Sequence, residues 1–199
     1  MDSSENLSTD VRRAAQILNA RTVPRLGIDR GGRPERIMHA LDGLLEPADA
    51  AAIGDISAQL WTACRTLLGV AEVEPDYILG LEAGGIVPAV GLAMASGLPY
   101  KIAYKLRLAL PGTIQFIEPH SARREMYAYG IEPGQRILIV DDEITTGRTI
   151  ANLVRILRQA DAEPLGAACL IEDASCGGRE RLSELGVPLA TLMTLPCLG

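Results

Sequence analysis

Residues 137–149 have the sequence ILIVDDEITTGRT, and this stretch decides the fold. Its first part belongs to the run RILIVD at 136–141, which is continuous in apolar, β-branched residues, as a strand buried on both faces should be. Apolar residues then recur with the helical spacing i, i+3, i+4 and i+7 at Ile150, Leu153, Val154 and Leu157. The stretch therefore predicts a buried strand, a short polar loop and an amphipathic helix that lies on the sheet.

Short apolar runs alternate with helical patterns from about residue 75 onward, as is typical of βαβ units and a parallel sheet. About thirty residues with weak periodicity follow 101–104, and a loop of that length inside a compact domain is usually functional or disordered. We expect an α/β fold with a twisted parallel sheet of about five strands flanked by helices. The strands are predicted at 77–80, 101–104, 136–141, 166–171 and 188–195, with further helices at 86–96 and 179–185.

Residues 1–74 are predicted to form a small N-terminal hood with a helical segment, while 75–199 form the α/β core of one compact domain. The segment RGGRPER at 30–36 is expected to be a turn or loop. Trp61 favours a place in the core or in a dimer interface over a role in base stacking. It belongs to a predicted helix whose apolar face carries Ile53, Ile56, Leu60, Cys64 and Leu67.

The composition of the chain favours a small-molecule partner. Its 199 residues are 48% hydrophobic, and a formal net charge of −6 argues against a broad nucleic-acid-binding face. No apolar run approaches the roughly 18 to 20 residues that span a bilayer, and the N-terminal MDSSEN is acidic where a signal peptide is basic. The four irregularly spaced cysteines form no C-x-x-C pair and are expected to be reduced thiols. We therefore expect a cytoplasmic protein without a membrane partner.

Two adjacent carboxylates, Asp141 and Asp142, are predicted at the carboxyl end of the buried strand, where open α/β sheets bind ligands. The next loop leads into a helix N-terminus, whose free N–H groups and partial positive charge suit a phosphate. Gly147 permits close approach of the backbone, and hydroxyl donors are available from Thr145, Thr146 and Thr149. The carboxylates suit sugar hydroxyls or a hydrated Mg²⁺. A ribose that carries a 5-phosphate satisfies both halves of this pattern.

The run of four apolar residues, two acids, two further residues and T-T-G-x-T resembles the signature with which type I phosphoribosyltransferases bind 5-phosphoribosyl-1-pyrophosphate (PRPP). The resemblance implies that Asp141 and Asp142 face the ribose 2- and 3-hydroxyls and help to seat Mg²⁺. Glu143 lies beside them and departs from the pattern, which usually has an apolar residue at that position. The implied cradle for the 5-phosphate consists of Thr145, Thr146, Gly147, Arg148 and Thr149.

A response-regulator receiver domain is the alternative for this strand, since receivers also carry an acidic pair that binds Mg²⁺ after such a run. Receivers have the pair near their start and need a phosphoacceptor aspartate well downstream of it. Only Asp161 and Asp173 follow here, and both lie too close. The pattern therefore favours the phosphoribosyltransferase interpretation.

Two further segments resemble the adenine and xanthine members of the family. GLEAGGIVPAVGLAMASGLP at 80–99 is similar to their pyrophosphate-binding strand, loop and helix, although the adenine enzymes usually have arginine where this chain has Gly84. The E-A-x-G core of that segment is filled by Glu82, Ala83, Gly84 and Gly85. KLRLALPGTIQ at 105–115 is similar to the flexible catalytic loop, and the tyrosine expected beside the loop glutamate is Pro119 here. The residues implied to act near the departing pyrophosphate are Lys105, Arg107 and Glu118.

By this resemblance the chain transfers 5-phosphoribosyl from PRPP to a nitrogen of an aromatic base, with Mg²⁺, and forms a nucleoside 5′-monophosphate and pyrophosphate. An adenine-like base is favoured, and orotate or a specialised heteroaromatic base comes next. Hypoxanthine and guanine come last, because this chain has Thr145 at the motif position where phosphoribosyltransferases for these bases usually have an aspartate. Purine salvage, a homodimer and a lid of about residues 106–125 are also implied.

A PRPP-sensing regulator without turnover is the second functional class, since regulators of purine synthesis can retain this fold. Such regulators usually add a DNA-binding winged helix, and residues 1–74 are too short and too weakly basic for one. Metal sites beyond the acidic pair are not indicated. His39 and His120 have no partners at metal-binding spacing, so each is expected to be solvent-exposed or to make a local hydrogen bond.

Overall fold

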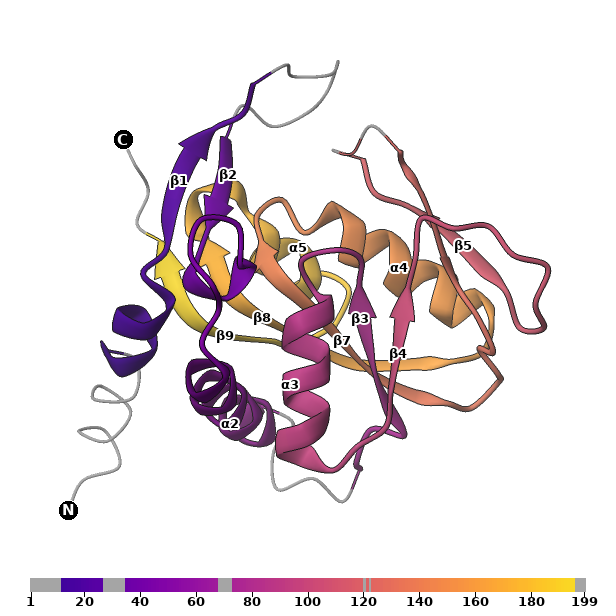
Figure 1. Cartoon of the computed structure of the whole chain (residues 1–199). Helices are drawn as coiled ribbons and strands as arrows, with labels where there is room; N and C mark the ends of the chain where they lie inside the picture. The colour runs from indigo at the N-terminus through magenta and orange to yellow at the C-terminus, as the bar shows by residue number, and fades with distance from the viewer. Residues whose placement is uncertain (1–11, 27–34, 68–72, 120, 122, 196–199) are drawn as a thin grey trace.

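Five parallel strands form the central sheet, in the spatial order β4-β3-β7-β8-β9 (Figure 1). Every neighbouring pair of these strands is parallel, which confirms the predicted sheet. The computed structural model describes residues 12–26, 35–67, 73–119, 121 and 123–195. The strands are β3 (Tyr77–Leu81), β4 (Tyr100–Ala103), β7 (Arg136–Ile144), β8 (Glu163–Asp173) and β9 (Leu189–Leu195), and the helices around them are α2 (Ala50–Leu67), α3 (Ile86–Ser96), α4 (Arg148–Gln159) and α5 (Gly178–Ser183), with a 3-10 turn η2 (Ala174–Cys176) before α5.

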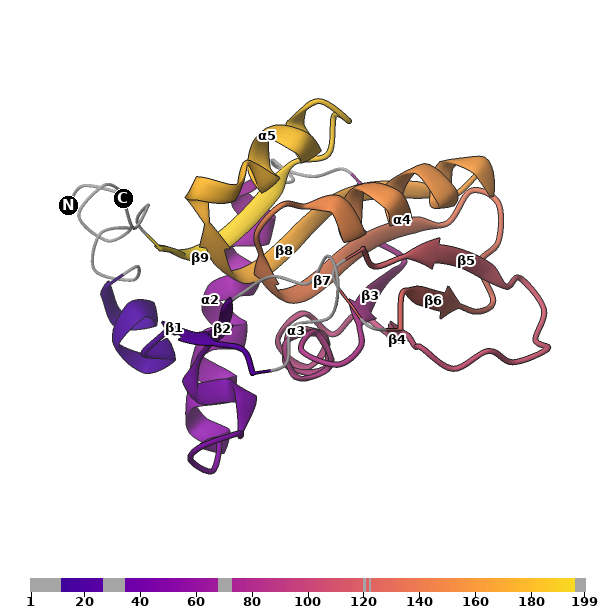
Figure 2. The same cartoon turned by 90° about the horizontal axis from the view of Figure 1, so that it is seen from above.

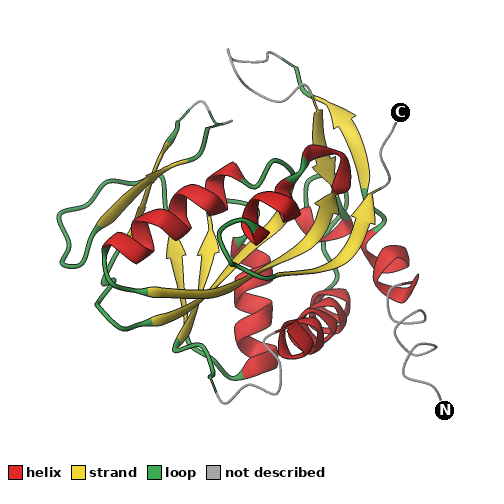
Figure 3. Ribbon diagram, turned by 180° about the vertical axis from the view of Figure 1, so that it is seen from behind, coloured by secondary structure: helices red, strands yellow, loops and turns green. Residues whose placement is uncertain are grey.

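Side chains of β7 alternate between two hydrophobic cores, one on each face of the sheet. Ile137 and Ile139 belong to the core that α4 and α5 cover, and Leu138 and Val140 belong to the opposite core beneath α2 and α3 (Figures 1 and 3). All four side chains have no exposed surface. The run RILIVD lacks a polar face because successive side chains of a strand point to opposite faces, and both faces are covered here.

We use the name hood for residues 12–26 and 35–42, which form a helix over 12–18, an antiparallel hairpin and a 3-10 turn. Ile37 of the hairpin is fully buried in the α2 side of the core, against which Trp61 of α2 also packs. The prediction of a loop at 30–36 is wrong for Glu35 and Arg36, which pair with β1, while 30–34 lie outside the described residues. The hairpin is β1 (Arg21–Pro24) with β2 (Glu35–Met38), and the turn is η1 (Ala40–Asp42).

The long weakly periodic segment contains a second hairpin, which the sequence analysis did not predict. Strands β5 (Ile114–Ile117) and β6 (Glu125–Ala128) pair antiparallel beside α4 (Figure 2). Phe116 and Met126 are buried in the same core as α4, and Asn152 of α4 donates a hydrogen bond to the Ile117 carbonyl at 2.9 Å. The strands are four residues each, too short to show a clear alternation in the sequence.

β7 is longer than predicted, and this changes where its acids lie. It pairs with β8 as far as Ile144, whereas its pairing with β3 stops at Val140. Asp141 and Asp142 therefore lie inside β7 and not at its end, which corrects the prediction. They still lie beyond the last pairing of β7 with β3, Gly80 with Val140, so one side of β7 is open to a ligand at this level of the sheet.

The described cysteines agree with the expectation of free thiols. Cys64 and Cys169 are buried free thiols, Cys176 donates to the Asp173 carboxylate at 3.4 Å, and Cys197 lies outside the described residues. Burial raises the pKa of the Cys64 thiol to about 12. In the part of the chain that the structure describes, no helix has both the length and the apolar character needed to cross a membrane.

Candidate active site

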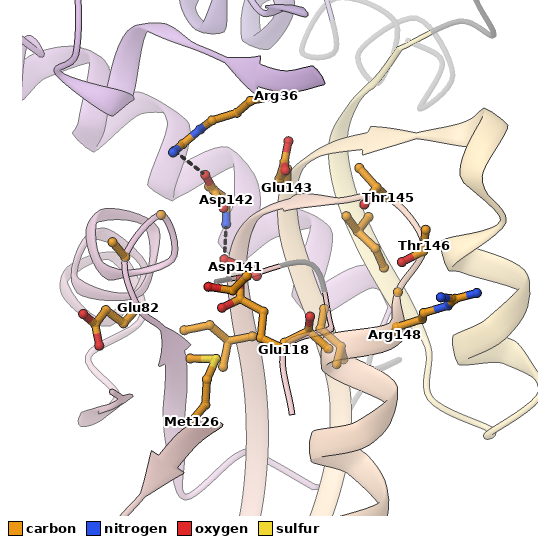
Figure 4. Close-up of a pocket in the computed structure, with 18 of the residues that line it drawn as sticks. Arg36, Glu82, Glu118, Met126, Asp141, Asp142, Glu143, Thr145, Thr146 and Arg148 are labelled. Carbon is orange, nitrogen blue, oxygen red and sulfur yellow. Dashed lines mark hydrogen bonds and ion pairs between the residues drawn. The ribbon is translucent and has the colours of Figure 1, made fainter. Parts of the chain in front are cut away.

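A cavity of about 240 Å³ opens where β7, the start of α4, the loop after β3 and the hood meet (Figure 4). It is strongly polar for its size, because carboxylates, cations and hydroxyls make up most of its wall. Its lining residues are Arg25, Glu35, Arg36, Leu81, Glu82, Ala83, Gly84, Lys105, Glu118, Ser121, Met126, Asp141, Asp142, Glu143, Ile144, Thr145, Thr146, Gly147, Arg148, Thr149 and Ile150.

The loop from Thr145 to Thr149 forms one wall and ends at the N-terminus of α4. Gly147 caps the helix with φ +64°, a left-handed conformation that glycine adopts without a steric penalty. A Cβ at this position would also lie 2.9 Å from the Gly178 carbonyl oxygen. Arg181 of α5 donates to the Thr146 carbonyl at 2.7 Å, so the loop is held from behind while its front faces the cavity. This geometry suits the binding of a phosphate by backbone N–H groups.

Of the two acids, Asp141 has the surroundings that stabilise a negative charge less well. Burial, then the neighbouring charges of Asp142 and Glu143, raise the pKa of Asp141 well above its ordinary value. One oxygen of Asp141 accepts the backbone N–H of Asp142 at 3.0 Å (Figure 4). A cation placed in the cavity would relieve this excess of negative charge.

Asp142 is held by the hood. Its Oδ2 lies 3.8 Å from a guanidinium nitrogen of Arg36 and 3.8 Å from His39 Nε2. Asp42 approaches the same two side chains, at 3.7 Å from Arg36 and 3.2 Å from His39 Nε2. Burial by itself would raise the pKa of Asp142, but His39, Asp141 and Arg36 together lower it below the ordinary value. The pKa values of the two neighbouring acids are therefore shifted in opposite directions.

His39 was expected to be exposed or locally hydrogen-bonded, and its exposure is ruled out. Its side chain is 2% exposed and lies between two carboxylates, Asp42 and Asp142. These three residues offer donor atoms within 4.8 Å of one another, a spacing that a divalent cation could use. Arg36 already brings a positive charge against both carboxylates, so we interpret the group as an ion-pair cluster. His120 lies outside the described residues.

Glu143, the residue that departs from the family pattern, connects β7 to the hood. Its carboxylate accepts the backbone N–H of Ile37 on β2 at 3.3 Å. An apolar side chain at this position could not accept that hydrogen bond. The unusual acid therefore has a structural partner, and it contributes to the cavity wall below the hairpin.

The opposite wall carries the residues implied for pyrophosphate. Lys105 Nζ lies 2.7 Å from the Glu118 carboxylate and donates to Ser121 at 3.0 Å. The backbone N–H of Lys105 donates to the Glu82 carboxylate at 2.5 Å. Lys105, Glu118 and Glu82 thus form one group on the cavity wall.

Two predicted residues do not reach the cavity. Arg107 is exposed and is not among the residues of its wall. Gly85 is buried, and a Cβ there would press against backbone oxygens of Leu81 and Val140, so its small size serves packing. In contrast, the hood contributes Arg25, Glu35 and Arg36, which sequence reasoning missed. For Glu35 and Arg36 the only signal was the cluster of charges in RGGRPER, and their pairing with β1 brings them to the cavity; Arg25, just after β1, had no signal in the sequence.

Comparison with known proteins identifies relatives of one kind. A family model described as the phosphoribosyl transferase domain matches residues 44–188. Adenine phosphoribosyltransferase of Gluconobacter oxydans (strain 621H) is 38% identical over 129 residues, which cover 63% of this chain and 70% of that protein. The protein of the same name from Acidiphilium cryptum (strain JF-5) is 38% identical over 124 residues, which cover 60% and 70%.

Solved structures with a similar fold extend the likeness to nearly the whole chain. The adenine phosphoribosyltransferase of Giardia lamblia complexed with 9-deazaadenine matches with a TM-score of 0.71 at 17% identity, covering 94% of this chain and 98% of that one. The Saccharomyces cerevisiae enzyme, complexed with an iminoaltritol bisphosphate and adenine, matches with a TM-score of 0.66 at 21% identity, covering 93% and 99%. At these identities the likeness is one of fold.

Proposed function

Because this chain belongs to the family of phosphoribosyl transferase domains, we propose that it transfers 5-phosphoribosyl from PRPP to a nitrogen of an adenine-like base. The products are a nucleoside 5′-monophosphate and pyrophosphate. One observation carries this proposal: Asp141 and Asp142 share a cavity wall with the loop from Thr145 to Thr149. That arrangement suits a ribose at the acids and its 5-phosphate at the N-terminus of α4.

The reaction forms a bond from the base nitrogen to C1 of the ribose and breaks the bond from C1 to the pyrophosphate oxygen. The base nitrogen loses its proton, and pyrophosphate leaves with the bonding electrons. Positive charge develops on the sugar and negative charge on pyrophosphate, as in other sugar transfers. The carboxylates of Asp141 and Asp142 stabilise the sugar, and the cation of Lys105 stabilises the departing group.

We also propose that the enzyme uses Mg²⁺, which the carboxylate of Asp141 would help to hold. The donor chemistry fits, because Mg²⁺ prefers carboxylate oxygens together with waters and substrate phosphates. Burial and then the nearby acids Asp142 and Glu143 raise the pKa of Asp141, and a bound cation would offset the effect of those acids. Mg²⁺ supplies charge neutralisation at the pyrophosphate when it is bound. Asp142 is already engaged by Arg36 and His39, so Asp141 is the better placed of the two predicted ligands.

The acceptor ranking rests on the relatives and on Thr145. Relatives at 36–38% identity are named adenine phosphoribosyltransferase, which supports adenine and a place in purine salvage. Orotate or a specialised heteroaromatic base is second, because the hood brings Arg25, Glu35 and Arg36 to the cavity. Hypoxanthine and guanine are last, since Thr145 cannot serve as a carboxylate partner for a purine N–H.

A panel of bases incubated with enzyme and Mg·PRPP, followed by chromatography and mass analysis of nucleotides, tests the activity and the ranking together. We expect AMP to form fastest. Turnover with guanine far above that with adenine would overturn the ranking. A PRPP-sensing regulator, the second candidate class, would bind PRPP and release no pyrophosphate with any base.

A homodimer and a cytoplasmic location complete the proposal. Support for the dimer comes from four exposed apolar side chains on α3 and around β4: Val87, Met94, Tyr100 and Tyr104. Light scattering on the purified protein tests it, with a mass of twice 21.2 kDa expected. Support for the cytoplasm comes from the buried free thiols of Cys64 and Cys169, because reducing compartments keep cysteines reduced. Cell fractionation tests the location.

A further inference from the structure

His39 has a fixed orientation against the acidic pair. Its backbone N–H donates to Asp42 Oδ2 at 2.9 Å, while its Nε2 faces the other oxygen of the same carboxylate at 3.2 Å. The backbone contact fixes Asp42 beside His39, and the burial of the ring leaves it little room to turn. Neither ring nitrogen completes a hydrogen bond with another described residue, although 98% of the side chain is buried. Burying an imidazole without hydrogen bonds costs free energy. We therefore asked which polar group its ring nitrogens serve.

Besides Asp42, the ring of His39 faces the carboxylate of Asp142. Its Oδ2 is the atom that both His39 Nε2 and the Arg36 guanidinium approach, each at 3.8 Å. The Arg36 side chain is 42% exposed and can move, whereas the His39 side chain is enclosed. His39 is therefore the more rigid of the two groups that fix this oxygen, and the second oxygen of the carboxylate is left to act on a ligand.

Gly84 makes the same orientation possible from the other side. A Cβ at residue 84 would overlap the carboxylate of Asp142, so any other residue would displace that side chain. The loop after β3 and the hood thus meet at one carboxylate, with space provided by Gly84 and polar contact provided by His39. These two residues are far apart in the sequence, and neither belongs to the acidic motif.

We propose that His39 is a positioning residue: held by Asp42, it fixes one oxygen of Asp142 so that the other meets the ribose of PRPP as positive charge develops at C1. The inference rests on the proposed function and deepens it, because it makes the hood part of the sugar site. A carboxylate that is oriented before the reaction stabilises the transition state without having to reorganise. Its effect should therefore fall on kcat more than on KM.

The first test compares two substitutions of His39. His39→Leu keeps a similar volume and removes the polar ring, and we expect kcat to fall about tenfold with KM for the base within about twofold of the wild type. His39→Gln restores an amide donor, and we expect it to recover kcat to within about threefold. Leu41→Val, a conservative change at a buried hood residue that lines no part of the cavity, is the matched control and should leave kcat unchanged.

The deciding measurement is a double-mutant cycle with Asp142→Asn. If His39 acts through Asp142, His39→Leu should lower kcat less than about twofold further in the Asp142→Asn background. Equal losses in both backgrounds would overturn the proposal. Failure of His39→Gln to recover kcat above His39→Leu would overturn it as well.

Gly84→Ala tests the same arrangement if the His39 variants do not fold. The added methyl should turn Asp142 away from the hood, lower kcat about tenfold, and show no further loss when combined with Asp142→Asn. Full additivity of the two changes would contradict the proposal. Wild-type enzyme is assayed first in every case. If it turns over no base, the proposed function is rejected. If it is active but the losses in the double variants are additive, only the positioning role is rejected.

Discussion

Replacing Asp142 with asparagine keeps the shape of the side chain and removes its charge. The side chain is 9% exposed, so water screens its charge weakly. At an effective dielectric constant of about 20 and a separation of about 5 Å from the developing charge, the interaction is worth about 3.3 kcal/mol. Each 1.36 kcal/mol is about tenfold in rate, so kcat should fall by about 10² or more. This size is typical of the loss of one preorganised electrostatic partner.

The assay is pyrophosphate release under saturating Mg·PRPP and base, with thermal unfolding measured alongside. Asp42→Asn is the matched control, because Asp42 is also buried against Arg36 and His39 but lies outside the cavity wall. We expect it to lower kcat by no more than about tenfold, through the orientation of His39. Normal turnover by Asp142→Asn, or equal losses in the two folded variants, would refute the assignment of Asp142 to the sugar.

Three further predictions concern the phosphate loop, the lid and the thiols. Gly147→Ala should destabilise the protein by about 1–2 kcal/mol or more and raise KM for PRPP. Alanine is strained at φ +64°, and its methyl group would press on Gly178. An unchanged melting temperature and KM would argue against this loop geometry. Amides at 106–125 should exchange more slowly with deuterium once Mg·PRPP and a base are bound, and equal exchange in both states would count against a lid. At pH 8 the native protein should be alkylated at Cys176 well before Cys64. Burial raises the pKa of the Cys64 thiol to about 12 and keeps this thiol protonated. Mass analysis of the labelled peptides tests the order of alkylation.

The central residues of the candidate site could be predicted from the sequence because they lie close together along the chain. From Asp141 to Thr149 the residues are neighbours along the chain, and local rules for a buried strand, a glycine turn and a helix start place them without tertiary information. The alternation of Ile137, Leu138 and Ile139 between two cores likewise follows from period-two geometry. The motif therefore predicted both the sheet and the phosphate end of the cavity.

The hairpins and the hood contacts were not predictable in this way. Strands β5 and β6 are short, and their pairing depends on Phe116 and Met126 being buried against α4. No local rule would have placed His39, which the sequence presented as an isolated histidine, between two carboxylates.

The order and spacing of adjacent residues were enough to predict the parallel α/β core and to single out the acidic pair and the loop from Thr145 to Thr149. Only the tertiary structure decided that Asp142 is oriented by the hood, that Glu143 binds the Ile37 N–H, and that Gly84 leaves room for the acid. Each of these contacts joins segments that are dozens of residues apart or more. Their geometry follows from how the hood packs on the sheet, and packing of that kind leaves no periodic trace in the chain.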